Sequence, residues 1–105
     1  MNTPIVTVFR SRLRDDAGDT YERTAAQMEQ LARAVPGFVD FKQFVGDDGE
    51  RVSLITFASR AAHDKWRDDP RHRAAQQRGR DDWYAEYHIQ VCELVAERIF
   101  PTDPR

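Results

Sequence analysis

The fold is decided by residues 38–57, which read FVDFKQFVGDDGERVSLITF. Its two flanks, Phe38–Val45 and Arg51–Phe57, are rich in aromatic and β-branched residues, a composition typical of strands. Between them, residues 47–49 read Asp-Asp-Gly, which favours a tight turn. This stretch therefore predicts two antiparallel strands joined as a β-hairpin.

The segment before the hairpin predicts a strand and a helix. Apolar and polar residues alternate through Ile5–Leu13, as in a half-buried strand. The segment Asp19–Val35 repeats its apolar residues at helical spacing, and Asp19 with Glu22 has the spacing of a capping box. The Pro-Gly pair at 36–37 should end this helix.

The segment after the hairpin predicts a second helix and a last strand. Ser59 should cap a helix that carries Trp66, Pro70 should restart it, and Gly79 should end it. Alternation predicts a long final strand over Tyr87–Ile99. The resulting order is β-α-β-β-α-β, the α+β ferredoxin-like pattern, with one antiparallel four-stranded sheet and both helices on one face.

The second face of this sheet also carries apolar residues. In the first strand Val6 and Val8 alternate with Ile5 and Phe9. Since the helices cover only one face, the other face is expected to pack against a second sheet. A second copy of the chain is the simplest source, which predicts a homodimer that closes a dimeric α+β barrel. The alternative is a set of scattered exposed apolar side chains, which are common on soluble proteins.

Length and charge limit the class of protein. The 105 residues predict a single domain over 1–105 with a flexible tail at 101–105. The net charge is −2 with acids and bases interleaved, which argues against a nucleic-acid partner. No stretch approaches the roughly 20 apolar residues of a membrane span, so no membrane partner is expected. The lone Cys92 fits a reducing compartment, and we expect a cytoplasmic protein.

The second half of the chain carries a recognisable pattern. From Trp66 to Tyr87 the sequence follows W-x3-P-x-H-x3-Q-x2-G-R-x3-Y-x2-Y, and Pro-Gly-Phe at 36–38 follows the first helix. The chain resembles the antibiotic biosynthesis monooxygenase (ABM) domain family over nearly its whole length. The resemblance implies a dimeric αβ barrel with a pocket between sheet and helices in each subunit. The family includes cofactor-independent oxygenases of phenolic or anthrone-like compounds, quinol oxygenases and haem-degrading enzymes, among which fold alone does not choose.

The resemblance implies two candidate catalytic residues. Trp66 would line the pocket and donate its ring N–H to the substrate, or it would be a core aromatic whose N–H is satisfied by backbone. His72 occupies the position where we align a tyrosine proton donor of the anthrone-oxygenase branch. It would exchange a proton near neutral pH, or it would tie the helix start to a neighbouring backbone group.

The expected substrate-binding residues are aromatic, thioether, amide and cationic side chains: Phe9, Met28, Phe44, Gln76, Arg80, Tyr84 and Tyr87. Tyr84 and Tyr87, together with Trp83, would wall an aromatic ligand or hydrogen-bond a quinol, or would pack the core and the dimer. Arg80 and Arg73 would orient an anionic substrate, although salt bridges to nearby aspartates are the stronger interpretation.

Two positions depart from branches of the family. The oxygenase branch carries an asparagine one turn before its tryptophan, where this chain has Ala62. The haem-degrading branch needs a histidine ten residues after its tryptophan, where this chain has Gln76, so haem ligation is not expected. No metal site is expected either, because His88 and Cys92 would lie roughly 13 Å apart along a strand.

Three functions therefore remain open. The first is a monooxygenase without metal, flavin or other cofactor, which uses O2 as co-substrate on a small phenolic, quinol or anthrone-like compound. The second is a dimeric protein that binds a small molecule without catalysis, which the missing asparagine favours. The third, haem binding or degradation, is disfavoured by Gln76.

Overall fold

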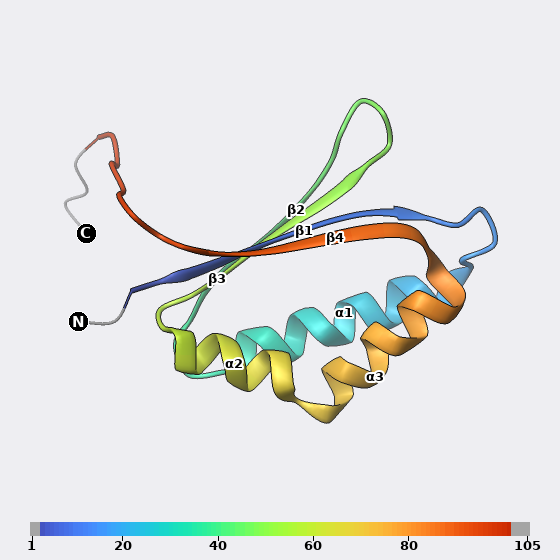
Figure 1. The fold of residues 1–105 in the computed structure, drawn as a ribbon, viewed down its shortest axis with the longest axis horizontal. Helices are drawn as coiled ribbons and strands as arrows, with labels where there is room; N and C mark the ends of the chain where they lie inside the picture. The colour runs from blue at the N-terminus through green and yellow to red at the C-terminus, as the bar shows by residue number, and fades with distance from the viewer. Residues whose placement is uncertain (1–2, 102–105) are drawn as a thin grey trace.

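The computed structural model describes residues 3–101, which form one antiparallel sheet with helices on a single face (Figure 1). The elements in chain order are β1 (Ile5–Leu13), α1 (Asp19–Ala34), β2 (Phe38–Val45), β3 (Arg51–Phe57), α2 (Arg60–Asp68), α3 (Pro70–Arg78), a single π-helical turn η1 (Gly79–Trp83) and β4 (Tyr84–Glu93). The strand order is β2-β3-β1-β4, and every neighbouring pair is antiparallel. The ferredoxin-like α+β fold predicted from the sequence is confirmed.

The first three strands begin and end where the sequence predicted, but the last strand does not. β4 runs over Tyr84–Glu93 rather than Tyr87–Ile99. Its partner is β1, and the pairing runs from Leu13 opposite Tyr84 to Ile5 opposite Glu93. Beyond Glu93 strand β1 offers no further residues, and only the N–H of Leu94 reaches back, to the carbonyl of Pro4 at 3.0 Å. The alternating pattern continues further than the strand because alternation becomes a strand only where a neighbour supplies hydrogen bonds.

The predicted capping box at the start of α1 is wrong. Gly18 is the N-cap, with φ 74°, and no side chain caps this helix. Asp19 is therefore the first helical residue, and its carboxylate lies with that of Glu22 in the first turn, where negative charge is favourable. The helix ends at Ala34, one residue earlier than predicted.

The start of α2 and the break before α3 follow the sequence closely. The hydroxyl of Ser59 accepts from the N–H of Ala62 at 3.2 Å. Asp69 ends α2 and also caps α3, where its carboxylate accepts from the N–H of Arg71 at 2.8 Å. Helix α3 ends at Arg78 with Gly79 as its C-cap, as predicted, but a π-helical turn follows directly. The backbone of Gly79 is right-handed helical at φ −59°, and the chain continues through η1 to Trp83.

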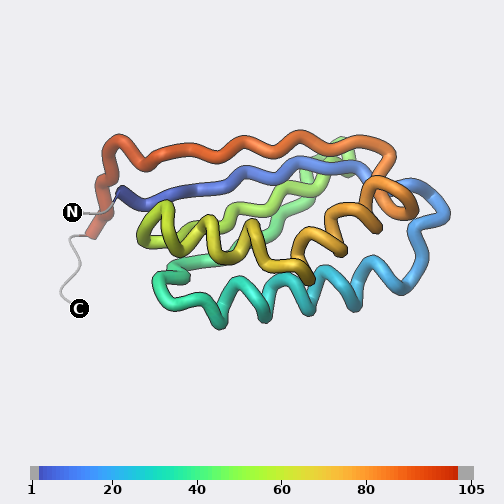
Figure 2. The backbone as a smooth tube through the Cα atoms, turned by 60° about the horizontal axis from the view of Figure 1, so that its bottom comes forward, coloured from blue at the N-terminus to red at the C-terminus, as the bar shows by residue number. Residues whose placement is uncertain are grey.

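The core lies between β3 and the helices. Ala32 of α1, Ile55 and Phe57 of β3, and Ala62 and Trp66 of α2 are buried together. Figure 2 shows all the helices packed against the same side of the sheet. The core is thus concentrated under β3 and β1 and leaves the helix-facing side of the edge strand β4 less covered, since Ile89 and Val91 remain 39% and 49% exposed.

The other face of the sheet has no covering element among residues 3–101. The register places Phe44, Val52 and Arg10 in one row of this face, and Leu54 beside Val8 in the next. The β2–β3 hairpin and the segment after β4 both rise on this side of the sheet (Figure 1). That segment exposes large apolar side chains, with Val95 95% accessible.

No described helix is both long and apolar enough to cross a bilayer. The predicted flexible tail lies outside the described residues except for Pro101.

Candidate functional site

A cavity of about 480 Å³ lies between the sheet and the helices. This is within the range of about 300–1,000 Å³ that small-molecule sites occupy. Side chains from the sheet, from α1, from α2 and α3, and from η1 line it, and most of them are apolar or aromatic. The principal ones are Thr7, Phe9, Ile55, Ile89 and Val91 from the sheet, Tyr21, Ala25 and Met28 from α1, His63, Trp66, His72, Ala75 and Gln76 from α2 and α3, and Trp83, Tyr84 and Tyr87 from η1 and β4.

Trp66 forms part of the wall contributed by α2. It lies one turn after Ala62, so both share the buried face of the helix. Its ring N–H donates to the backbone carbonyl of Met28 at 3.3 Å, which is the backbone-satisfied arrangement considered from the sequence. The indole N–H is therefore already engaged, and the ring offers the cavity its apolar surface.

His72 lies directly against Trp66, with ring centroids 4.1 Å apart and planes tilted by 39°. The Asp69 cap and Pro70 start α3 so that His72 falls on its buried side. Its Nδ1 is 3.4 Å from the carbonyl oxygen of Arg67, a long contact. Burial lowers the pKa of His72, and the neighbouring His63 adds to the effect against opposing contributions from the Arg67 carbonyl and Asp69. His72 is therefore neutral near pH 7.

Edge-to-face aromatic rings form the opposite end of the cavity. The ring of Tyr84 lies 5.5 Å from Phe9, 5.7 Å from Tyr87 and 5.9 Å from Tyr21, measured between centroids. Burial raises the pKa of the Tyr84 hydroxyl far above its usual value, and a hydrogen bond with Tyr21 adds to the effect, so this hydroxyl stays protonated. Gly79 makes room for the ring, because a Cβ there would lie 2.5 Å from Cε2 of Tyr84.

Most of the residues expected from the sequence to bind substrate line this cavity. Phe9, Met28, Gln76, Tyr84 and Tyr87 all do so, as do Trp66 and His72.

Two expected residues do not line the cavity. Phe44 pairs with Val52 on the far face of the sheet, where it is 54% exposed, so its predicted place in the pocket is wrong. A bulge between Phe38 and Asp40 sets the phase of β2, and as a result Phe41 rather than Phe44 faces the helices. Arg80 is outside the cavity and exposed, and it donates to the hydroxyl of Tyr87 at 3.3 Å.

Arg73 and Trp83 also have identified contacts. Arg73 pairs with Asp68 at 2.9 Å on the exposed side of the helices, in line with the salt-bridge interpretation. Trp83 is buried, its ring is 5.8 Å from that of Tyr21, and its N–H donates to the hydroxyl of Thr20 at 3.2 Å. Trp83 therefore supports the aromatic wall as a packing residue.

Sequence reasoning missed several polar residues of the cavity, and three of them, Thr7, Ser53 and His63, are buried. The signal was present, because His63 lies three residues before Trp66 on the same helical face, and Thr7 alternates with Val6 and Val8 on the inward side of β1. Ala62, by contrast, belongs to the core and packs against Gly37, where an added Cβ would be 2.9 Å from its own.

The cavity opens beside β4. Tyr87, Ile89 and Val91 line it and yet remain 38% to 49% exposed, whereas Trp66 and His72 at the inner end are buried. Among residues 3–101 no group of three or more histidine, cysteine or acidic side chains is arranged to hold a metal ion.

Comparisons with known proteins agree with this architecture. The profile of the family described as "Antibiotic biosynthesis monooxygenase" matches residues 4–78. YqjZ of Bacillus subtilis, named as an uncharacterized protein, is 30% identical over 97 residues, which cover 92% of this chain and 85% of YqjZ. Among solved structures, Rv0793 from Mycobacterium tuberculosis has a TM-score of 0.78 at 22% identity and covers 90% of this chain and 97% of its own. SnoaB from Streptomyces nogalater, described as a cofactor-independent oxygenase, has a TM-score of 0.74 at 15% identity and covers 94% and 98%.

Proposed function

This chain belongs to the antibiotic biosynthesis monooxygenase family, and on that premise we propose that it is a cofactor-independent monooxygenase of a small aromatic compound. The substrate is a phenolic, quinol or anthrone-like molecule, and O2 is the co-substrate. The description of the structurally similar SnoaB as a cofactor-independent oxygenase supports this choice.

The observation that carries the proposal is the aromatic cavity with a neutral imidazole at its inner end. Its volume of about 480 Å³ suits a ligand of a few fused rings, and its walls are dominated by aromatic and aliphatic side chains. Such walls bind a planar ring and exclude water from a reactive carbanion. The substrate itself supplies the electrons. An anthrone CH2 group and O2 give a carbonyl and water, and a hydroquinone and O2 give a hydroxyquinone and water, so no further reductant is needed.

The roles of the residues follow from their positions. Trp66 and the ring of Phe9 hold the planar substrate between helix and sheet, and His72 moves a proton at the inner end. The protonated Tyr84 hydroxyl and that of Tyr87 hold a substrate oxygen at the other end. Gln76 of α3 provides a side-chain amide that can form a hydrogen bond with the substrate.

Oxygen consumption tests the proposal. Metal-stripped protein is mixed with a panel of anthrones and hydroquinones, and O2 uptake and product are followed. We expect uptake that stays unchanged after metal removal and that falls at least about 100-fold in His72→Ala. Lys65→Ala, an exposed change on α2, should retain wild-type turnover. Absence of turnover across the panel, or full turnover in His72→Ala, would contradict the proposal.

The proposed enzyme is a homodimer that closes a barrel through the uncovered face of the sheet. Val6, Val8, Val52 and Leu54 are half-buried on that face, and Phe44 is exposed beside them. The β2–β3 hairpin and the segment after β4 extend on the same side of the sheet, where they would contact a second copy (Figure 1). A stable interface of this kind typically buries about 1,200–2,000 Å².

A second candidate, a dimer that binds a small aromatic molecule without oxidising it, is favoured by two contacts. The N–H of Trp66 is taken by the Met28 carbonyl, and Ala62 lies in the core where the oxygenase branch carries an amide. If this second function is correct, compounds from the same panel should raise the Tm of the protein without being converted to product.

A further inference from the structure

One histidine that lines the cavity, His63, is paired with a carboxylate outside it, and the roles proposed so far do not use this pair. His63 of α2 is 3% exposed, and its Nδ1 lies 2.9 Å from Oδ1 of Asp64. Asp64 is in turn 3.3 Å from the guanidinium of Arg67. Because an ionised carboxylate only accepts hydrogen bonds, it holds the neutral imidazole in the tautomer with its proton on Nδ1. The lone pair is then on Nε2.

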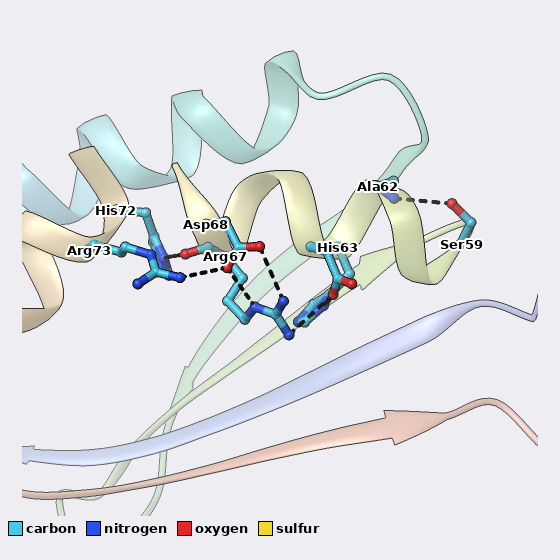
Figure 3. A network of polar contacts seen from close by, with 8 residues as sticks. Ser59, Ala62, His63, Arg67, Asp68, His72 and Arg73 are labelled. Atoms are coloured by element: carbon cyan, nitrogen blue, oxygen red, sulfur yellow. Dashed lines mark hydrogen bonds and ion pairs between the residues drawn. The ribbon is translucent and has the colours of Figure 1, made fainter. Parts of the chain in front are cut away.

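The Nε2 atom of His63 is available to a molecule in the cavity. Within residues 3–101 no group forms a hydrogen bond with Nε2, whereas Nδ1 of the same ring is bonded to Asp64. The imidazole lines the cavity and meets the ring of Phe57 edge to face, with centroids 6.1 Å apart. Figure 3 shows the side chains of His63 and Arg67 extending from α2 toward the strands. His63 therefore lines the cavity with its Nδ1 engaged, while the partly exposed carboxylate of Asp64 lies outside the lining.

A second polar group in the same cavity lacks a partner. Thr7 of β1 is 5% exposed, and its Oγ1 is buried without a hydrogen bond to any described residue. Thr7 pairs with Ile55 of β3, and Phe57, which contacts His63, lies on the same face one row further along that strand. A buried hydroxyl without a partner is unfavourable, and a ligand oxygen in the cavity would satisfy it.

His63 is better suited than His72 to accept the first proton. A cationic His72 would lie against Trp66, with a distant carbonyl and the more remote charge of Asp69 in its favour, and burial lowers its pKa despite them. A cationic His63 would keep its hydrogen bond to Asp64 and gain a charge of opposite sign at 2.9 Å. The other charged or titratable groups near this ring are Arg67, which pairs with Asp64, and His72 itself.

We propose that His63, positioned by Asp64, is the base that removes the first proton from the substrate, and that the Thr7 hydroxyl binds the substrate oxygen next to that position. This rests on the proposed monooxygenase function. In the step, a phenolic O–H or an anthrone C–H bond breaks heterolytically and its electron pair stays on the substrate as phenolate or enolate. The proton moves to Nε2, and Asp64 faces the resulting imidazolium. His72 remains neutral and serves later proton transfer.

Turnover of variants separates the two histidines. His63→Gln should lower kcat/KM at least about 100-fold and remove the acidic limb of its pH profile. Asp64→Asn should lower kcat/KM less and shift the acidic limb of the pH profile. The isosteric Thr7→Val should raise KM more than it changes kcat. Lys65→Gln, an exposed change on the same helix, should match wild type. Retention of activity and of the acidic limb in His63→Gln, while His72→Gln is inactive, would overturn the assignment of His63.

Two measurements decide the proposal even if no panel compound is oxidised. Nitrogen-15 NMR of the three imidazoles, assigned with the histidine variants, should show His63 protonated on Nδ1, and a proton on Nε2 would overturn the proposal. The absorbance of 4-nitrophenol bound at a pH slightly below its solution pKa should show phenolate in wild type and Lys65→Gln, and neutral phenol in His63→Gln. Equal ionisation in all three proteins, or no binding at millimolar concentration, counts against His63 as the base. Proton transfer without O2 uptake would instead reject only the oxygenase function.

Discussion

Replacing Gly79 with alanine tests how tightly the aromatic wall of the cavity is built. In Gly79→Ala the new Cβ would lie 2.5 Å from Cε2 and 2.7 Å from Cδ2 of Tyr84, where ordinary contacts are 3.4–4 Å. The Tyr84 ring must therefore move by about 1 Å. It cannot do so freely, because Phe9, Tyr21 and Tyr87 contact it on several sides. Such overpacking typically costs ~1–3 kcal/mol.

An opposing effect reduces the net change. Gly79 has helical backbone angles, φ −59° and ψ −46°, and alanine is favoured over glycine there by about 0.5–1 kcal/mol. The free energy of unfolding should thus fall by up to roughly 2.5 kcal/mol in Gly79→Ala. For a domain of this size each 1 kcal/mol lowers the Tm by roughly 4–8 °C.

A double-mutant cycle with Tyr84→Val measures the steric part. Valine removes both clashing ring atoms and suits the start of a strand, so in that background Gly79→Ala should stabilise the protein by about 0.5–1 kcal/mol. Urea unfolding followed by circular dichroism and by fluorescence gives all four free energies. The reasoning is refuted if Gly79→Ala is equally destabilising in both backgrounds, or if it stabilises the wild-type background.

Three further predictions concern pH, a helix cap and assembly. Because burial lowers the pKa of His72, the unfolded chain binds a proton more readily, so stability should decline as the pH falls below about 6.5 with a slope of at most ~1.4 kcal/mol per unit. Urea unfolding of His72→Gln should show a flatter dependence, and identical slopes would contradict this. Ser59→Ala should lose about 1 kcal/mol with its bond to the Ala62 N–H, and Ser59→Thr should restore most of it. In sedimentation, Leu54→Lys on the uncovered face should convert a dimer into monomers while Lys65→Glu should not, and a wild-type monomer at micromolar concentration would exclude the interface.

The strands and helices could be predicted from the sequence where the signal was local. Alternation defined Ile5–Leu13, and the Asp-Asp-Gly turn defined the hairpin. The end of β4 could not be predicted this way, because the length of β1 determines where pairing stops. The π turn after Gly79 could not be predicted either, because the closeness of this glycine to the Tyr84 ring is a tertiary contact.

The residues of the cavity, too, could be predicted only where the signal did not depend on contacts between distant elements. Trp66 and His72 were predicted because a family pattern places them, whereas Phe44 was misplaced because a bulge after Phe38 alters which β2 residues face the helices. A bulge is a property of the pairing between two strands, which the sequence of one strand does not reveal. The spacing of His63 and Thr7 indicates that both point inward, but their burial and the missing partner of the Thr7 hydroxyl are known only from the structure.

The unequal coverage of the cavity has a consequence for the shape of the molecules it can accept. On the side of α2 and α3 Trp66 and His72 are buried, while on the side of β4 Ile89 and Val91 remain accessible along the outermost strand. A flat polycycle would enter with its bare ring leading and leave any sugar, acyl tail or carrier attachment trailing into solvent. For the proposed monooxygenase, a bulky substituent on the trailing ring would then interfere little with binding of the flat nucleus.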